Sequence, residues 1–261
     1  MSKFPYFLAM DADSALQSDS LEQLVRPILE EENVVACGGF VRLSNAVVLE
    51  NGKVKSYSLP NNLLVCMQIL EYDRSFLASR ILLDEYNGNL IISGAFGLFQ
   101  KEIVLACNGY EVGTVGEDFE LVTKLHSFCY KNNIDYSIKY VPDAVCWTQA
   151  PNKLRDLVKQ RRRWYIGLIQ CMFKYKEMFC NYHYGFISFI SYFYYLFFEF
   201  LAPFIEVLGT VTTITALMYG LLNVPFMIIF FILYTLFGCV MTLTTFFARV
   251  HLANNKLSFM D

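Results

Sequence analysis

The sequence has few of the residues that build zinc sites and disulfide frameworks. Its 261 residues include three histidines, none beside a cysteine pair, and eight scattered cysteines without a C-x-x-C motif. This pattern indicates free, buried thiols in a reducing compartment. The chain also lacks a basic excess, with 21 basic and 24 acidic residues and a net charge of -3. Nucleic-acid binding is therefore not expected, because such proteins normally carry a basic face.

Charge is also sparse in the C-terminal part of the chain. Hydrophobic residues make up 55% of the sequence and aromatic residues 16%, more than soluble domains usually contain. The excess lies after residue 184. Near the N-terminus, the apolar run 6–10 is short and ends in aspartates, so the sequence predicts no signal peptide. The composition predicts a soluble part followed by a membrane part.

Two segments are long enough to cross a bilayer, which takes about 20 residues. Residues 186–219 form the first, with a bend expected at Pro203, and residues 224–247, which contain no charge, form the second. Basic residues precede the first span, and Arg249 and Lys256 follow the second. The positive-inside rule then places both flanks in the cytoplasm and predicts a multi-pass protein of the cell membrane.

Before these spans, basic residues alternate with apolar ones along 152–179, which predicts an amphipathic helix on the headgroup surface. Within the first span, Glu199 and Glu206 lie on one helical face. They are interpreted either as functional intramembrane carboxylates or as residues at the headgroup boundary. The predicted domains are an α/β part at 1–151, the interfacial helix at 152–184, two transmembrane helices at 185–250 and a cytoplasmic tail at 251–261.

The soluble part shows alternating strand and helix patterns, which predict an α/β fold. Expected strands are 4–10, 34–43, 138–141 and 145–148, and expected helices are 20–32, 61–83, 101–107 and 117–131. Asn51-Gly52 predicts a tight hairpin turn. Gly38-Gly39 predicts a bulge or a close backbone approach in the second strand.

Asp11 and Asp13 follow the first predicted strand and are separated by one residue. Mg²⁺ and Mn²⁺ are commonly held by one or two carboxylates together with phosphate oxygens of a substrate. The D-x-D pattern is therefore a candidate metal site. A polar turn after a strand explains the same residues equally simply.

A second acidic pair, Glu117-Asp118, opens the helix predicted at 117–131. A positioned carboxylate can act as general base when a sugar is transferred to a hydroxyl group. The alternative is an ordinary helix start, where the helix dipole stabilises acidic side chains.

Gln160 to Trp164 form a Q-x-x-R-W cluster. Arg163 can offer a planar fork to a diphosphate, and Trp164 can stack on a sugar ring. Alternatively, the cluster belongs to a basic membrane-surface helix, as expected for Arg161 and Arg162. The segment 93–97, with two glycines, allows a backbone to approach a ligand or is a packed strand.

Taken in order, these motifs resemble a membrane-integrated family 2 glycosyltransferase of the processive polysaccharide-synthase type, such as the synthases of poly-N-acetylglucosamine, hyaluronan and chitin. The likeness runs from about residue 4 to residue 250. Besides the motifs above, it includes Val41-Arg42, Glu71-Tyr72, Gly109-Tyr110, Pro142-Asp143, Cys146-Trp147-Thr148 and the segment 198–206.

The resemblance implies a GT-A fold, a UDP-sugar donor, a divalent metal (Mg²⁺ or Mn²⁺) and inversion at the anomeric carbon. The donor sugar is expected to be N-acetylglucosamine and the acceptor a growing polysaccharide or oligosaccharide, with membrane lipid around the helices. The implied site consists of Asp13 and Asp11 at the metal, Asp118 as base with Glu117 in support, Gln160 and Arg163 at the diphosphate, and Trp164, Gly94, Ala95 and Phe96 at the acceptor.

In one respect the sequence departs from this pattern. In the family, the D-x-D motif follows several strands that bind the nucleotide, whereas here it stands at residue 11. The expectation is a partial GT-A domain, with an incomplete Rossmann-like sheet and little transferase activity alone. The chain would then be a fragment or one half of a split gene, and in the second case a separate chain would supply the missing half. Single transfer to a lipid-linked acceptor and a non-catalytic membrane partner remain alternatives.

Overall fold

The computed structural model describes residues 3–45, 47–58 and 60–252. The chain forms two compact units, Met1–Tyr192 and Phe193–Asp261. The predicted tail at 251–261 lies, from residue 253 onward, outside the described residues.

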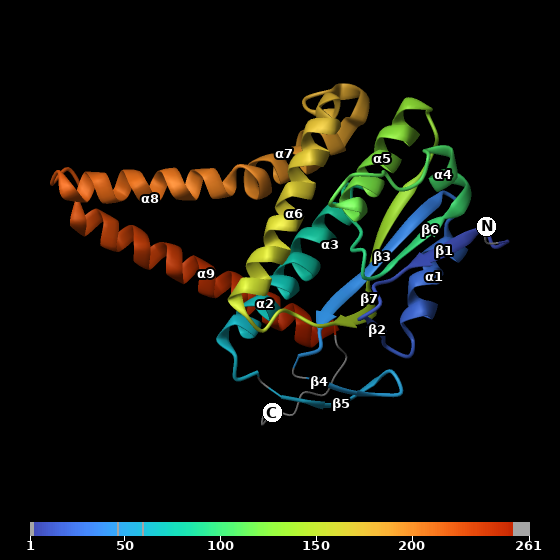
Figure 1. The fold of residues 1–261 in the computed structure, drawn as a ribbon, viewed down its shortest axis with the longest axis horizontal. Coiled ribbons are helices and arrows are strands. Elements are labelled where there is room, and N and C mark those ends of the chain that lie inside the picture. Colours follow the sequence, from blue (N-terminus) through green and yellow to red (C-terminus); the bar gives the residue numbers. More distant parts are fainter. Residues whose placement is uncertain (1–2, 46, 59, 253–261) are drawn as a thin grey trace. The chain divides into compact units, whose positions relative to one another are not determined.

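The first unit contains the strands and most of the helices (Figure 1). The strands are β1 (Tyr6–Ala9), β2 (Ala15–Leu16), β3 (Val34–Leu43), β4 (Val47–Glu50), β5 (Lys53–Tyr57), β6 (Gly97–Gln100) and β7 (Ser137–Thr148). The longer helices are α1 (Ser20–Glu30), α2 (Leu63–Arg74), α5 (Glu117–Lys131) and α6 (Leu154–Lys174). Shorter helical segments are η1 (Ser75–Ser79), α3 (Arg80–Asp84), α4 (Lys101–Ala106), η2 (Lys176–Met178), η3 (Tyr182–Tyr184), η4 (Ile187–Ser191) and the first residue of α7 (Tyr192–Tyr194).

Five strands form the main sheet in the order β1-β6-β3-β7-β2. β3 runs parallel to β7, and the other neighbouring pairs are antiparallel. The strand predicted at 34–43 is confirmed as β3, which is buried along nearly its whole length, as its continuous apolar run indicates. The two short strands predicted near 140 and 146 form one strand, β7, whose register with β3 shifts after Val141.

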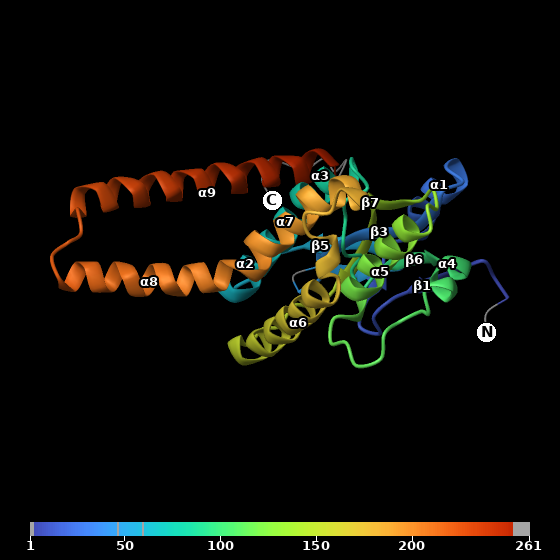
Figure 2. The same cartoon turned by 90° about the horizontal axis from the view of Figure 1, so that it is seen from above.

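Helices cover both faces of this sheet (Figure 2). Leu121 and Leu125 of α5 pack in one core cluster with Ala36 of β3. Leu24 of α1 packs in another cluster with Cys37, the next residue of the same strand. Because successive strand residues point to opposite faces, α5 and α1 lie on opposite sides of the sheet. The predicted α/β architecture is thus a helix–sheet–helix sandwich.

The glycine pair in β3 has the predicted role. The register of β3 shifts between Gly39 and Phe40. A Cβ atom at Gly39 would lie 2.2 Å from the Phe96 ring, so only glycine fits this approach. The hairpin predicted at Asn51-Gly52 is also confirmed, because β4 and β5 pair there and both turn residues have positive φ, 51° and 71°.

Helix boundaries follow the sequence closely in the site region. The helix predicted at 117–131 is confirmed as α5. The helix predicted at 61–83 is continuous as α2, η1 and α3 but contains a π-helical turn at Ser75–Ser79. Such turns interrupt α-helices locally and cannot be read from apolar spacing. The amphipathic helix predicted at 152–179 is α6, which ends at Lys174.

The second unit contains the rest of α7, η5 (Tyr195–Phe200), α8 (Ala202–Met218) and α9 (Val224–Leu252). Within α9, Val224–Thr244 is long and apolar enough to cross a membrane, with a mean hydropathy of 2.4. Ile187–Phe200 and Ala202–Met218 are bent by 43° relative to each other, next to Pro203, where the bend was predicted. By length and composition, the described residues thus provide one candidate span, or two if the bent pair is a single span.

Candidate functional site

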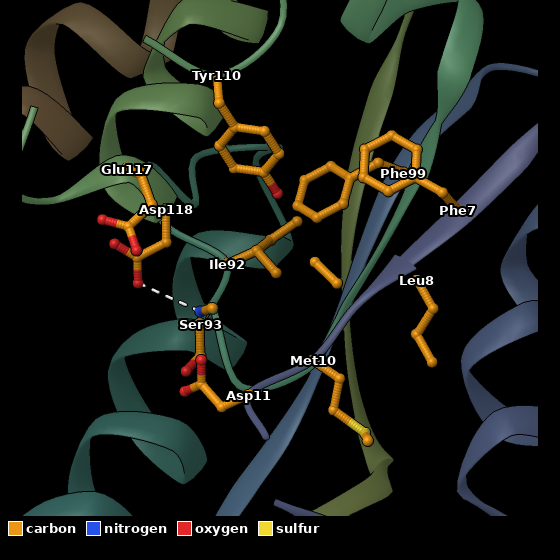
Figure 3. Close-up of a pocket in the computed structure, with 12 residues that line it drawn as sticks. Phe7, Leu8, Met10, Asp11, Ile92, Ser93, Phe99, Tyr110, Glu117 and Asp118 are labelled. Carbon is orange, nitrogen blue, oxygen red and sulfur yellow. Dashed lines mark hydrogen bonds between the residues drawn. The ribbon is translucent and has the colours of Figure 1, made fainter. Parts of the chain in front are cut away.

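A pocket of about 420 Å³ opens beside the C-terminal end of β1. The residues that line it come from β1 and the two residues after it, β6 and the segment before it, the loop before α5 and the first turn of α5. They are Phe7, Leu8, Ala9, Met10, Asp11, Ile92, Ser93, Gly94, Phe99, Tyr110, Glu117 and Asp118. Figure 3 shows that the carboxylates of Asp11, Glu117 and Asp118 gather on one side of it, away from Phe7 and Phe99.

The first predicted acidic motif lies at this pocket. Asp11 follows β1, and the Ser14 N–H donates to the Asp11 carbonyl oxygen at 3.1 Å, which closes a turn that contains Asp13. Burial raises the pKa of Asp11, and the negative charges of Asp13 and Glu117 raise it further, whereas the charge of Arg163 lowers it. Charges influence one another this way only over short distances. Asp11 and Glu117, which are 106 positions apart, line the same pocket, and the charge of Arg163 acts on Asp11.

Asp118, at the start of α5, is held in place by two backbone N–H groups. The Gly94 N–H donates to Oδ2 at 3.2 Å, and the Phe119 N–H donates to Oδ1 at 2.8 Å. Burial raises the pKa of Asp118, and these two hydrogen bonds and the Arg80 charge oppose that shift. The carboxylate is half-buried, oriented and at the pocket wall, which is the placement a general base requires.

The three residues predicted at the acceptor from the 93–97 segment differ in position. Gly94 lines the pocket with its backbone. Ala95 is 5% exposed and Phe96 is fully buried, with its ring in the core beside Leu24. The Phe96 and Ala95 side chains thus do not face the pocket, and any contact of this segment with a ligand is made by its backbone.

The predicted Q-x-x-R-W residues lie on α6 and do not line the pocket itself. Arg163 is exposed and acts on Asp11 through its charge. Trp164 is 39% exposed, and its ring centroid lies 6.5 Å from that of Tyr72 on α2. The side-chain oxygen of Gln160 is buried and has no hydrogen-bond partner among the described residues.

Arg161, expected as a membrane-surface charge, has a charged partner on another helix. Its guanidinium makes a two-pronged ion pair with Glu71 on α2, in which Nη2 lies 2.6 Å from Oε2. The same guanidinium lies 4.8 Å from the centroid of the Trp164 ring. Arg161 therefore fixes the exposed tryptophan between α2 and α6. This role could not be read from the sequence because the ion-paired residues are 90 positions apart.

Sequence reasoning also missed several residues of the pocket. Phe7, Ile92 and Phe99 form its apolar wall, and Tyr110 enters from the loop before α5. Burial raises the pKa of Tyr110, and so do the charges of Asp118 and Glu117. A signal was present for Tyr110, because Gly109-Tyr110 is among the motifs that carry the family resemblance.

The acidic side of the pocket has few side chains that could hold a divalent cation. Among the described residues, no three His, Cys, Asp or Glu side chains are grouped to hold a metal ion. Asp11 and Asp13 nevertheless supply the hard oxygen ligands that Mg²⁺ and Mn²⁺ prefer, next to a third carboxylate. Two carboxylates suffice for an ion that is also bound by phosphate oxygens of a ligand. The donor set fits a metal ion that binds together with a diphosphate.

A family model described as "Glycosyl transferase family group 2" matches residues 6–247. The chain is 27% identical over 166 residues to the poly-beta-1,6-N-acetyl-D-glucosamine synthase of Staphylococcus epidermidis. The matched region covers 64% of this chain and 35% of that protein. It is 25% identical over 212 residues to chitin synthase 6 of Pyricularia oryzae, which covers 71% of this chain and 10% of that protein. The chain thus spans about a third or less of the length of these curated relatives.

Among solved structures, the mannosyltransferase PcManGT from Pyrobaculum calidifontis, in complex with GDP-Man and Mn²⁺, is similar with a TM-score of 0.57 and 16% identity. The match covers 97% of this chain and 63% of that chain. At this identity the likeness concerns the fold, which is α/β and GT-A-like, as predicted.

Proposed function

Because the chain belongs to glycosyl transferase family group 2, we propose that its pocket beside β1 transfers a sugar from a nucleotide-sugar diphosphate to an acceptor hydroxyl group. One observation carries the proposal. Asp118, oriented by the Gly94 N–H, lines the same pocket as Asp11, although the two aspartates come from distant parts of the sequence. An ordinary helix start or polar turn does not require them to meet.

Asp11 and Asp13 are the proposed ligands of Mg²⁺ or Mn²⁺. The presence of Mn²⁺ in the complex of PcManGT, a protein of similar fold, supports a divalent ion. When bound, such an ion neutralises the negative charge that grows on the departing diphosphate. Arg163 and Gln160 are proposed to bind the diphosphate from α6, by donating hydrogen bonds from the guanidinium and the side-chain amide NH₂ to its oxygens.

Asp118 is proposed to accept the proton of the acceptor hydroxyl as its oxygen bonds to the anomeric carbon and the bond to the diphosphate breaks. Attack from the side opposite the leaving group inverts that carbon. Glu117 supports the charge of the site from the adjacent position. Trp164, with the segment Gly94, Ala95 and Phe96, is proposed to border the acceptor, through the indole ring and the backbone respectively.

The names of the relatives favour a particular substrate. A poly-N-acetylglucosamine synthase and a chitin synthase both support UDP-N-acetylglucosamine as donor and a growing polysaccharide as acceptor. A single transfer to a lipid-linked acceptor is the alternative, and product length distinguishes the two. We further propose that 1–151 forms the catalytic part on the cytoplasmic side, 152–184 an interfacial helix and 185–250 two membrane spans. The candidate span Val224–Thr244 supports the last of these.

The test uses membranes of the source organism that carry Asp118→Asn, with Asp143→Asn as matched control because Asp143 does not line the pocket. Incorporation of labelled N-acetylglucosamine from its UDP donor should be lost in Asp118→Asn, while Mn²⁺-dependent UDP binding is kept. The control should retain both. Unchanged incorporation in Asp118→Asn would refute the role of base, and absence of Mn²⁺-dependent UDP binding in the unaltered protein would favour a non-catalytic membrane partner.

A further inference from the structure

A buried glutamate lies on α5, two residues after Asp118. The Glu120 side chain is 0% exposed. Its Oε1 accepts hydrogen bonds from Lys174 Nζ and from the Tyr175 hydroxyl, both at 2.7 Å. Lys124 Nζ lies 3.3 Å from its other oxygen. A buried carboxylate is costly unless it is paired and hydrogen-bonded, so these contacts hold the end of α6 firmly against α5.

The same cluster of charges reaches the loop that enters the pocket. Glu111 Oε2 lies 3.1 Å from Lys174 Nζ and 3.3 Å from Lys124 Nζ. Lys124 Nζ also donates to the Gly109 carbonyl oxygen at 2.8 Å. Glu111 and Gly109 flank Tyr110, which lines the pocket. We call Glu111, Glu120, Lys124, Lys174 and Tyr175 the Glu120 cluster.

The second contact between the two helices is made by backbone atoms. A Cβ atom on Gly167 of α6 would lie 2.6 Å from Gly116 Cα, at the residue before α5. At this point the backbone of α6 touches the backbone of the residue before α5 with no side chain between them. The contact can therefore serve as a pivot about which α6 rotates. Arg163 lies four residues before Gly167, about 6 Å along the helix axis, and Lys174 lies seven residues after it, about 10 Å. The Glu120 cluster and Arg163 therefore lie on opposite sides of Gly167 along α6.

We propose that Glu120 is a positioning residue that fixes the direction of α6 about the Gly116–Gly167 contact and thereby places Arg163 beside Asp11. The proposal rests on the proposed function, because it gives Arg163 the diphosphate to bind. A rotation of about 10° about the pivot would move a residue 6 Å away by about 1 Å, given the helix rise. A misplacement of about 1 Å is enough to lower a rate by about 100-fold.

Two further contacts between these elements remain when Glu120 is changed. The Val115 N–H donates to Gln170 Oε1 at 3.0 Å, and Cys171 Sγ lies 3.9 Å from the Phe119 carbonyl oxygen. Both lie within four residues of Gly167, so they act close to the pivot and resist rotation of α6 only weakly. The Glu120 contacts act farthest from the pivot. Their loss should therefore loosen α6 rather than detach it.

The test is hydrogen exchange of the full chain in detergent, with Glu120→Ala and the milder Glu120→Gln. The matched control is Glu177→Gln, which removes the exposed Lys131–Glu177 ion pair of 3.2 Å between α5 and η2. We expect Glu120→Ala to speed exchange at least 10-fold in 109–118 and 154–166, with α1 and β3 unchanged, and the control to have no effect. Unchanged exchange in both segments, or an equal increase in α1 and β3, would overturn the proposal. If the alanine variant does not fold, the glutamine variant decides by the same pattern.

Calorimetry of UDP with Mn²⁺ separates positioning from loss of folded protein. Partial unfolding lowers the binding stoichiometry and leaves Kd unchanged, whereas a displaced Arg163 raises Kd, by about 10-fold here. If Glu120 acts through Arg163, adding Glu120→Ala to Arg163→Ala should raise Kd less than twofold further. Additive effects would overturn the proposal. If the unaltered chain does not bind UDP with Mn²⁺, the proposed function fails, and the exchange pattern still decides whether Glu120 holds α6.

Discussion

Replacement of Gly167 by alanine should displace helix α6 about one turn from Arg163. The new Cβ would lie 2.6 Å from Gly116 Cα, whereas ordinary van der Waals contact begins at 3.4 Å. Both partners are backbone, so neither can rotate away, and the helices must separate by about 0.8 Å. Arg163 stands one helical turn from this contact and moves with it.

The expected cost can be estimated from packing. Overpacking a tight contact destabilises by about 1–3 kcal/mol, and alanine returns about 1 kcal/mol through its higher helix propensity. The free energy of unfolding should therefore change by less than about 2 kcal/mol, and the protein should fold. The larger effect is on ligand binding, because a shift of about 1 Å at Arg163 should weaken UDP binding with Mn²⁺ by at least about 10-fold.

The assay is calorimetry of the full chain in detergent, with a thermal melt to verify folding. Gly209→Ala is the matched control, since Gly209 is also helical and a Cβ there would meet nothing within 4 Å. The control should bind UDP like the unaltered protein. A Kd for Gly167→Ala within twofold of the unaltered value, in a folded sample, would refute the argument that this contact sets the position of α6.

Three further predictions follow from the charges of the first unit. The acid limb of kcat/KM should have its midpoint above pH 3.8, because burial raises the pKa of Asp118 and only its ionised form can accept a proton; a pH–rate profile checks this. Arg163→Ala should weaken UDP binding with Mn²⁺ by about 10-fold in titrations, whereas Arg162→Ala, one position away, should not. His126 should contribute a loss of up to about 3 kcal/mol in the free energy of unfolding as the pH drops from 6.5 to about 4, because burial lowers its pKa from 6.5 to about 4 and only the unfolded chain takes up that proton. Burial raises the pKa of Asp84 to about 6, which acts in the opposite direction, so urea titrations at several pH values compare the unaltered protein with His126→Gln, and the same pH dependence in both would contradict the prediction.

Local patterns in the sequence were sufficient where one segment determines its own structure. The Asn51-Gly52 turn needs only positive φ at two residues, and α5 has the bounds that its apolar period predicts. The placement of Asp11 shortly after the strand β1 was likewise local. Ordered motifs then indicated that Asp11, Asp118 and Arg163 belong together, and the pocket and charges agree with that grouping.

What the sequence did not reveal depends on contacts between distant segments. Glu120 looks like any acidic residue in the first turn of a helix, but it is buried and, besides Lys124 on its own helix, it contacts Lys174 and Tyr175, which are 54 and 55 positions away. Phe96 looks like a ligand-facing aromatic beside two glycines, but the bulge at Gly39 opens a space that its ring fills. Single-sequence patterns contain no record of such pairings.

The charge balance of the pocket limits what it can bind. Besides burial, the negative charges of Asp13 and Glu117 raise the pKa of Asp11, and the charge of Arg163 opposes them. A bare diphosphate would meet more negative than positive charge there and be repelled. A divalent cation alone would find two carboxylates in an exposed turn, which is a weak site. Cation and diphosphate together satisfy both groups of charges, so the pocket should bind them jointly and neither one tightly by itself.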